Sequence, residues 1–194
     1  MVNKLSTYFT EKMISNGTIS DKDKELYIYG LFMFLSQLMF FIIACIFGFL
    51  LNCIIESIIF YIAFQFIRKY AGGYHAATET RCEILSTLSI SVCIVVIRLS
   101  KTYDFQTILL IIGAVSAVCI FVFCPLDTPE KPLSKKEFKY FRKISLTILL
   151  VISISVIVSY IFKFQMVLVP CCLSLILESV LIVAGKIKKI KISY

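Results

Sequence analysis

Long apolar runs alternate with short polar islands along this chain. Six runs stand out, and they cover 26–47, 49–67, 83–99, 105–124, 144–162 and 165–184. A helix of about 20 apolar residues, rising 1.5 Å per residue, crosses the ~30 Å hydrocarbon core of a bilayer. The pattern therefore predicts an all-α integral membrane protein with about six transmembrane helices.

Two places in this pattern are unusual. The first and second runs join through Gly48, Asn52 and Cys53, so the turn between them must be very tight. The third run, 83–99, is short and rich in serine. It fits either a complete span or a tilted or re-entrant element that packs against protein.

The segment before the first run has a different period. Apolar residues recur there at steps of three and four, which is typical of one face of an amphipathic helix. These residues are Val2, Leu5, Phe9 and Met13. We expect a helix over 2–14 that lies on the membrane surface and ends at Asn16-Gly17. Ser20, with Asp23 three residues later, resembles a capping box that opens the next helix.

Composition and charge support this membrane assignment. Hydrophobic residues make up 59% of the chain and the mean hydropathy is +0.93, whereas soluble domains are about 45–50% apolar. The net charge of +8 could suggest nucleic-acid binding, but the basic residues flank the apolar runs and no RNA-binding motif is present. Anionic lipid headgroups explain these charges better.

The basic residues also predict an orientation. Seventeen of the 20 Lys and Arg residues lie in alternate islands, and by the positive-inside rule these islands face the cytoplasm. We therefore expect a single polytopic domain over 1–194, with both termini cytoplasmic. Residues 1–25 form its cytoplasmic surface segment, 26–184 its transmembrane bundle and 185–194 its basic cytoplasmic tail.

One cytoplasmic island contains candidate chemistry. His75 is the only histidine of the chain, and Cys82 is the only one of eight cysteines that lies in a polar island. An imidazole that takes the proton of a thiol produces a thiolate nucleophile. By themselves, the two residues also fit an interfacial histidine and an incidental cysteine. The remaining cysteines fit small hydrophobic residues, and their spacing predicts neither zinc nor another metal or cofactor.

Seven residues of unbroken helix would hold His75 and Cys82 about 10.5 Å apart. A working pair needs about 3–4 Å, so the helix must break between them, or the pair must form across a homodimer. Gly72-Gly73 loosens the backbone at that place. Thr80 with Glu83 fits a capping box for the next helix, and a cap at Thr78 is the alternative.

The same island resembles the signature of the accessory gene regulator B family. The matching residues are Arg68, Gly73-Tyr74-His75-Ala76 and Cys82, seven residues after the histidine. A second match is the proline loop at 125–133, which has Glu130 where the family often has Asn. Chain length, six hydrophobic segments and the basic loop also fit.

This resemblance implies a bacterial membrane endopeptidase that processes a short amphipathic quorum-sensing propeptide of the AgrD type. Cys82 would be the nucleophile and His75 the base. The enzyme would expel the acidic C-terminal segment of the propeptide and hold the remainder as a thioester. A Cys or Ser of the same peptide would then close a thiolactone or lactone ring. No third catalytic residue is implied.

Other residues of this region are candidates for supporting roles, together with Arg68 and Gly73 of the motif. An orienting partner of His75 could be Glu79, Gln65 or Glu83. Ser86 lies four residues after Cys82, where it could help an oxyanion or bond a preceding carbonyl. Lys131 fits either a contact to the acidic substrate or a topology charge.

Two carboxylates lie inside the apolar runs. We expect a structural role in helix packing for Glu56, and Glu178 could pair with a neighbouring helix or stay protonated. A transporter or peptide exporter without covalent chemistry would instead line a pathway with both, and Cys82 would be dispensable. A membrane scaffold or sensor is a third possibility. Blocking Cys82 with a thiol reagent separates the peptidase from both alternatives.

Overall fold

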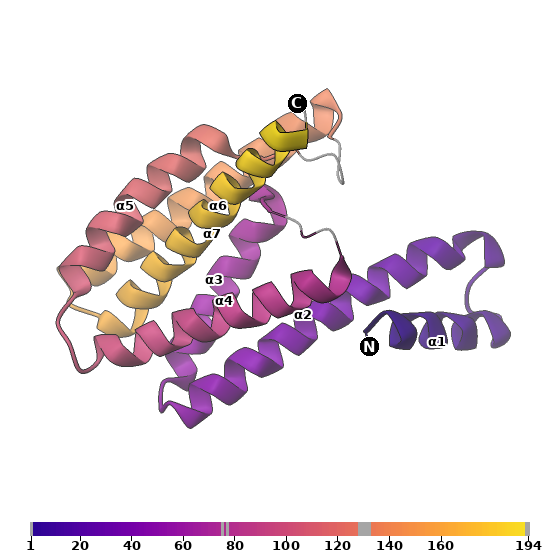
Figure 1. The fold of residues 1–194 in the computed structure, drawn as a ribbon, viewed down its shortest axis with the longest axis horizontal. Coiled ribbons are helices and arrows are strands. Elements are labelled where there is room, and N and C mark those ends of the chain that lie inside the picture. The colour runs from indigo at the N-terminus through magenta and orange to yellow at the C-terminus, as the bar shows by residue number, and fades with distance from the viewer. Residues whose placement is uncertain (1, 75, 77, 128–132, 193–194) are drawn as a thin grey trace. The chain divides into compact units, whose positions relative to one another are not determined.

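The computed structural model describes residues 2–74, 76, 78–127 and 133–192. Its regular elements in these ranges are helices, drawn in Figure 1. They are α1 (Val2–Ser15), the 3-10 helix η1 (Asp21–Asp23), α2 (Lys24–Leu50), α3 (Ile54–Ala71), α4 (Glu79–Ser100), α5 (Gln106–Phe123), α6 (Lys135–Ile161) and α7 (Gln165–Ile192). The prediction of an all-α protein is confirmed.

Each of the six apolar runs corresponds to one long helix, from α2 to α7. Within the described residues, five of these helices are long and apolar enough to cross a membrane, namely α2, α4, α5, α6 and α7. The exception is α3, whose 18 residues include Glu56, Arg68 and Lys69. The third run is not short in the structure, because α4 has 22 residues.

Residues 1–43 and 44–194 form two compact units. In the first, α1 ends at Ser15 and Gly17 follows with a φ of +70°. Glu11 pairs with Lys24 at 3.2 Å. The hydroxyl of Ser20 accepts a hydrogen bond from the amide of Lys22, so the predicted capping box with Asp23 is replaced by a tighter 3-10 turn.

The predicted apolar stripe of α1 is divided in the structure. Val2 is buried together with Ser6 and Thr10, whereas Leu5 and Phe9 are exposed. Apart from Val2, small hydroxyl residues rather than large apolar ones therefore form the buried side of α1. The exposed side is the one that a membrane-surface helix would need.

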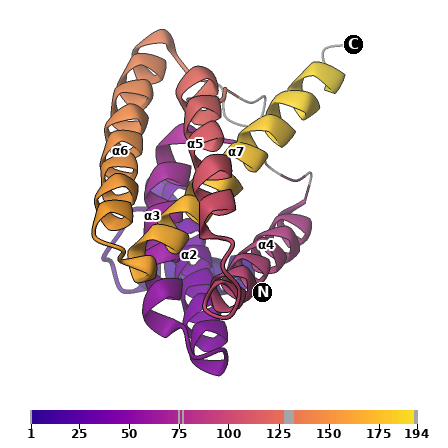
Figure 2. The same cartoon turned by 90° about the vertical axis from the view of Figure 1, so that its left-hand side faces the viewer.

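The second unit is built around α7, which packs against α3, α5 and α6 (Figures 1 and 2). Two thirds (67%) of its apolar window is buried, against at most 28% for the windows of α4, α5 and α6. These outer helices expose large apolar side chains, such as Leu88, Val115 and Leu150. Surfaces of this kind suit a lipid solvent, which identifies α7 as the core helix of a membrane bundle.

The predicted tight turn between the first two runs is confirmed. Only three residues separate α2 from α3, and Asn52 has a φ of +54°. The amide of Cys53 donates to the carbonyl of Gly48 at 2.8 Å. A Cβ at Gly48 would lie 2.7 Å from the hydroxyl oxygen of Ser57, so the glycine allows the two helices to approach closely.

Candidate functional site

The helix break between the two candidate catalytic positions is confirmed. The helix α3 ends at Ala71, α4 begins at Glu79, and the described residues between them are not helical. One straight helix through the island is therefore excluded. His75 itself lies outside the described residues.

Cys82 is the fourth residue of α4. The N-cap is Thr78, whose hydroxyl accepts from the amide of Arg81, and the amide of Cys82 donates to the carbonyl of Thr78 at 3.1 Å. The expected cap at Thr80 with Glu83 is therefore wrong, and the alternative at Thr78 is correct. Cys82 then lies one turn after the N-cap and its own amide is already bonded within the helix, so the helix end stabilises an anion there only weakly. Activation of the thiol would have to come from a side chain.

Exposure separates Cys82 from most other thiols of the chain. The side chain of Cys82 is half-buried. Five cysteines are buried, namely Cys53, Cys93, Cys124, Cys171 and Cys172. Cys45 and Cys119 are also half-buried, but both lie within helices that are long and apolar enough to cross a membrane. Of the described thiols, only Cys82 combines partial exposure with a position at the polar end of a helix.

Arg68 joins the end of α3 to the segment that follows. Its guanidinium donates to two carbonyl oxygens, from Nη1 to Gly72 at 2.5 Å and from Nη2 to Tyr74 at 2.6 Å. The rigid fork of an arginine suits two acceptors held side by side. Arg68 therefore fixes the backbone on both sides of Gly73.

Gly73 is required at its place for two reasons. Its φ is +133°, a conformation that L-residues rarely adopt. In addition, a Cβ there would overlap the Nη1 atom of Arg68. Gly72, with a φ of +78°, makes the preceding part of the turn.

The helix α7 supplies the surface on which this segment rests. The amide of Tyr74 donates to the carbonyl of Leu181 at 2.8 Å. A Cβ at Gly185 would lie 2.9 Å from the nitrogen of Tyr74, so the missing side chain leaves the Leu181 carbonyl open to this donor. Our sequence analysis did not identify Leu181 or Gly185. A glycine beside the basic tail was the only signal for either.

The proline loop lies against the same segment. The amide of Leu126 donates to the carbonyl of Ala71 at 2.8 Å, and Leu126 forms an isolated parallel bridge with Gly72. Asp127 accepts from the amide of Leu133 at 3.1 Å and pairs with Lys189 at 3.6 Å. The two motifs that are far apart in the sequence therefore meet in the structure.

Several candidate residues lie outside the described residues or form no hydrogen bond or ion pair with a described side chain. Lys131 and Glu130 of the proline loop lie outside the described residues, and so does the side chain of Glu79. Gln65 and Glu83 are half-buried, as is Ser86, which lies one turn after Cys82. Ser86 makes no hydrogen bond through its hydroxyl to any described residue. Roles for these residues remain predictions.

The two carboxylates of the apolar runs have separate partners. Glu56 pairs with Lys101 at 2.5 Å, as its expected structural role requires. Glu178 is fully buried, and its Oε1 lies 4.0 Å from Nη1 of Arg68. This proximity to Arg68 of α3 agrees with the expected pairing of Glu178 with a neighbouring helix. Two separate ion pairs give no support to a transport pathway lined by both carboxylates.

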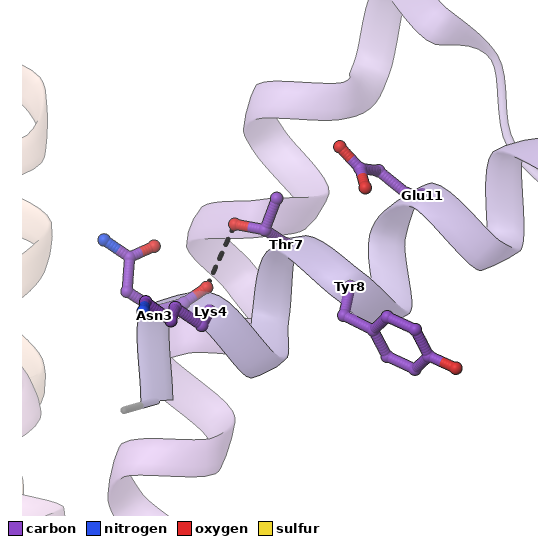
Figure 3. Close-up of a pocket in the computed structure, with 5 residues that line it drawn as sticks. All are labelled: Asn3, Lys4, Thr7, Tyr8 and Glu11. Carbon is purple, nitrogen blue, oxygen red and sulfur yellow. Dashed lines mark hydrogen bonds between the residues drawn. The ribbon is translucent and has the colours of Figure 1, made fainter.

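A shallow hollow on α1 is unrelated to these features (Figure 3). It is lined by Asn3, Lys4, Thr7, Tyr8 and Glu11. All five come from one helix, and the hydroxyl of Thr7 donates a hydrogen bond to the carbonyl of Asn3 at 3.0 Å. The carboxylate of Glu11 is engaged in the ion pair with Lys24, and no residue of the proposed catalytic pair lies among the five, so we assign no chemistry to the hollow.

Comparisons with known proteins identify relatives over most of the chain. The family model for accessory gene regulator B matches residues 6–182. A putative AgrB-like protein of Clostridium perfringens (strain SM101 / Type A) is 33% identical over 157 residues, which are 77% of this chain and 72% of that protein. Putative AgrB-like protein 2 of C. perfringens (strain 13 / Type A) is 30% identical over 156 residues, with the same two shares.

A third relative, matched over a shorter stretch, is the accessory gene regulator protein B of Staphylococcus aureus (strain MW2). It is 31% identical over 113 residues, which are 56% of this chain and 59% of that protein. No solved structure matches significantly.

Proposed function

The chain belongs to the accessory gene regulator B family, and from this premise we propose that it is a membrane cysteine endopeptidase that matures a quorum-sensing propeptide. Membership supports a role in accessory gene regulation. The proposed substrate is a short amphipathic peptide with an acidic C-terminal tail. Cys82 would cleave it, with His75 as the base.

The proposed reaction has two acyl transfers. His75 takes the thiol proton of Cys82, and the sulfur attacks a peptide carbonyl of the substrate. The tetrahedral intermediate collapses, the C–N bond breaks, and the imidazolium returns the proton to the leaving amine. The thioester that remains is attacked by a Cys or Ser of the same peptide. This releases Cys82 as a thiol and closes a thiolactone or lactone ring.

One observation carries this proposal. The residue before His75 is held at both polar groups of its backbone, because Tyr74 donates to Leu181 and accepts from Arg68. A connection between helices is usually mobile, and this one is tied to two helices. A base needs a fixed position to act on a nucleophile, so such anchoring supports a catalytic His75.

Charge supports the proposed substrate. Exposed lysines begin α6, directly after the proline loop, at positions 135, 136 and 139. In the orientation that the positive-inside rule predicts, these lysines and the Cys82 end of α4 share the cytoplasmic side. A basic surface there would attract an acidic propeptide tail. The bilayer edge would screen the thioester from water and favour ring closure over hydrolysis.

The test is cleavage of the propeptide by full-length protein in membranes. We expect Cys82→Ala, Cys82→Ser and His75→Ala to abolish cleavage while the protein still inserts. The matched control is Cys93→Ala, a buried thiol of the same helix, which should keep cleavage near the wild-type rate. A Cys82→Ala protein that still cleaves at the wild-type rate would remove the proposed mechanism.

A second measurement tests the intermediate. When the ring-closing nucleophile of the propeptide is replaced, the acyl group has no internal acceptor. We then expect mass spectrometry to find a peptide adduct on Cys82. Finding the adduct on another cysteine would contradict the assignment.

A further inference from the structure

We propose that Glu178 is a positioning residue for this peptidase. Its buried carboxylate holds the Arg68 guanidinium on the two carbonyl groups that flank Gly73, and so fixes the segment that leads to His75. The inference rests on the proposed function and adds to it a residue on α7, about 100 positions later in the chain. Glu178 acts through Arg68 and touches no reacting atom.

The surroundings of Glu178 call for a counter-charge. The side chain is fully buried inside an apolar helix, and neither carboxylate oxygen has a hydrogen-bond partner among the described residues. A buried carboxylate is costly in such a place unless a cation compensates it. Arg68 is that cation, at 4.0 Å. The pair interacts by charge, without a direct hydrogen bond.

Arg68 uses its donors on the backbone instead. Both terminal nitrogens donate to carbonyl oxygens, and the side chain keeps 18% of its surface exposed. A guanidinium without a counter-charge would gain hydration by turning toward solvent. The carbonyls of Gly72 and Tyr74 would then lose their donor. Removing the charge of Glu178 should therefore loosen the backbone directly before His75.

The position of Glu178 on α7 fits this role. Glu178, Leu181 and Gly185 follow one another at steps of three and four, so they share one face of the helix. Each contacts the Arg68 to Tyr74 region in a different way. Glu178 supplies charge, Leu181 supplies an acceptor and Gly185 leaves space. This face of α7 therefore holds one backbone segment, from Arg68 to Tyr74.

The chain offers a matched control in Glu56. This carboxylate is also buried and also ion-paired, with Lys101 at 2.5 Å. It lies in the first turn of α3, whereas Arg68 lies in the last turn. Its contacts involve the turn between α2 and α3, through Lys101 and the carbonyl of Asn52. A loss there should affect folding without moving His75.

The test uses the single histidine of the chain. Full-length protein in lipid nanodiscs, labelled with ¹³C at histidine, gives one imidazole Cε1 resonance that reports on His75 alone. We compare Glu178→Gln, which keeps size and removes charge, with Glu178→Asp, which keeps charge and changes size. We expect the Glu178→Gln variant to show a shifted or split resonance and the Glu178→Asp variant to show it near the wild-type position. Glu56→Gln should leave the resonance unchanged.

Cleavage kinetics provide a second readout. We expect Glu178→Gln to lower kcat at least tenfold with little change in KM, because the substrate-binding charges lie elsewhere, and Glu178→Asp to recover most of kcat. A packing role predicts the opposite order, with Gln tolerated and Asp harmful. That order, or equal behaviour of the two variants in both measurements, overturns the proposal.

The two proposals fail separately. If His75→Ala still cleaves the propeptide, the peptidase mechanism is wrong, while the resonance still reports whether Glu178 positions the segment. If His75→Ala is inactive and Glu178→Gln matches wild type in resonance and kcat, the mechanism stands and the role of Glu178 is wrong.

Discussion

Replacing Gly185 with alanine tests whether contact with α7 sets the position of the His75 segment. In most helices this change is favourable, because alanine has a higher helix propensity than glycine by about 1 kcal/mol. Gly185 differs because the backbone of the segment occupies the space of its missing side chain. The new Cβ would lie 2.5 Å from Cδ2 of Leu126, a side-chain end that can turn away, and 2.9 Å from the backbone nitrogen of Tyr74 and 3.0 Å from the carbonyl carbon of Gly73, which cannot.

The size of the effect follows from these distances. Ordinary van der Waals contact begins at 3.4 Å, so the backbone would have to move by about 0.5 Å. Overpacking of this kind costs about 1–3 kcal/mol, which the propensity gain offsets in part. Net destabilisation should therefore stay below about 2 kcal/mol. A displacement of 1 Å near a reaction centre can cost about 100-fold in rate, so we expect cleavage to fall roughly tenfold.

The assay compares cleavage per folded molecule with unfolding in mild detergent. Gly30→Ala is the control, because Gly30 is also helical and a Cβ there would meet no described atom within 4 Å beyond its own helix backbone. That variant should gain up to about 1 kcal/mol of stability and keep full activity. If Gly185→Ala were as active and as stabilised as Gly30→Ala, the segment would not rest on α7 as we describe.

Two further predictions concern stability and orientation. Lys101→Met leaves the Glu56 carboxylate buried without its partner and should destabilise the protein by about 1–3 kcal/mol in detergent unfolding. The double variant with Glu56→Gln should recover part of this loss. If the destabilisations of the two single variants simply add in the double variant, the pairing is contradicted. A cysteine placed at position 104 should react with an impermeant maleimide from outside intact cells, and one at position 131 should not. Equal labelling of both would refute the proposed orientation.

The sequence pattern located the helices well and their ends less well. Every apolar run became a helix because lipid leaves the backbone no other way to satisfy its polar groups. The run at 144–162 nevertheless belongs to a helix that begins at Lys135. Ser134 and Glu137 form a complete capping box there, so the helix starts in the polar region, where hydropathy gives no signal.

The candidate site was predictable only where the signal was local. Gly72 and Gly73 indicated the helix break after α3, because glycine has more conformational freedom than other residues. Thr78 and Thr80 are both good caps, and the structure uses Thr78, a choice that the local sequence left open. The same holds for Arg68 and Glu178, because 110 residues separate them and only the packing of α3 on α7 brings them together.

The anchoring face of α7 has a consequence for how the chain can change in length. Its contacts with the His75 segment fall at 178, 181 and 185, and Lys188 continues them with its ammonium 5.5 Å from the ring centre of Tyr74. One inserted or deleted residue between these positions would rotate all later ones by about 100° and shift them by about 1.5 Å. The Glu178 carboxylate, the Leu181 carbonyl and the space beside Gly185 would then no longer lie on one face of α7. We therefore expect the fold to tolerate insertions and deletions far better in the turn before α5 than anywhere between 178 and 188.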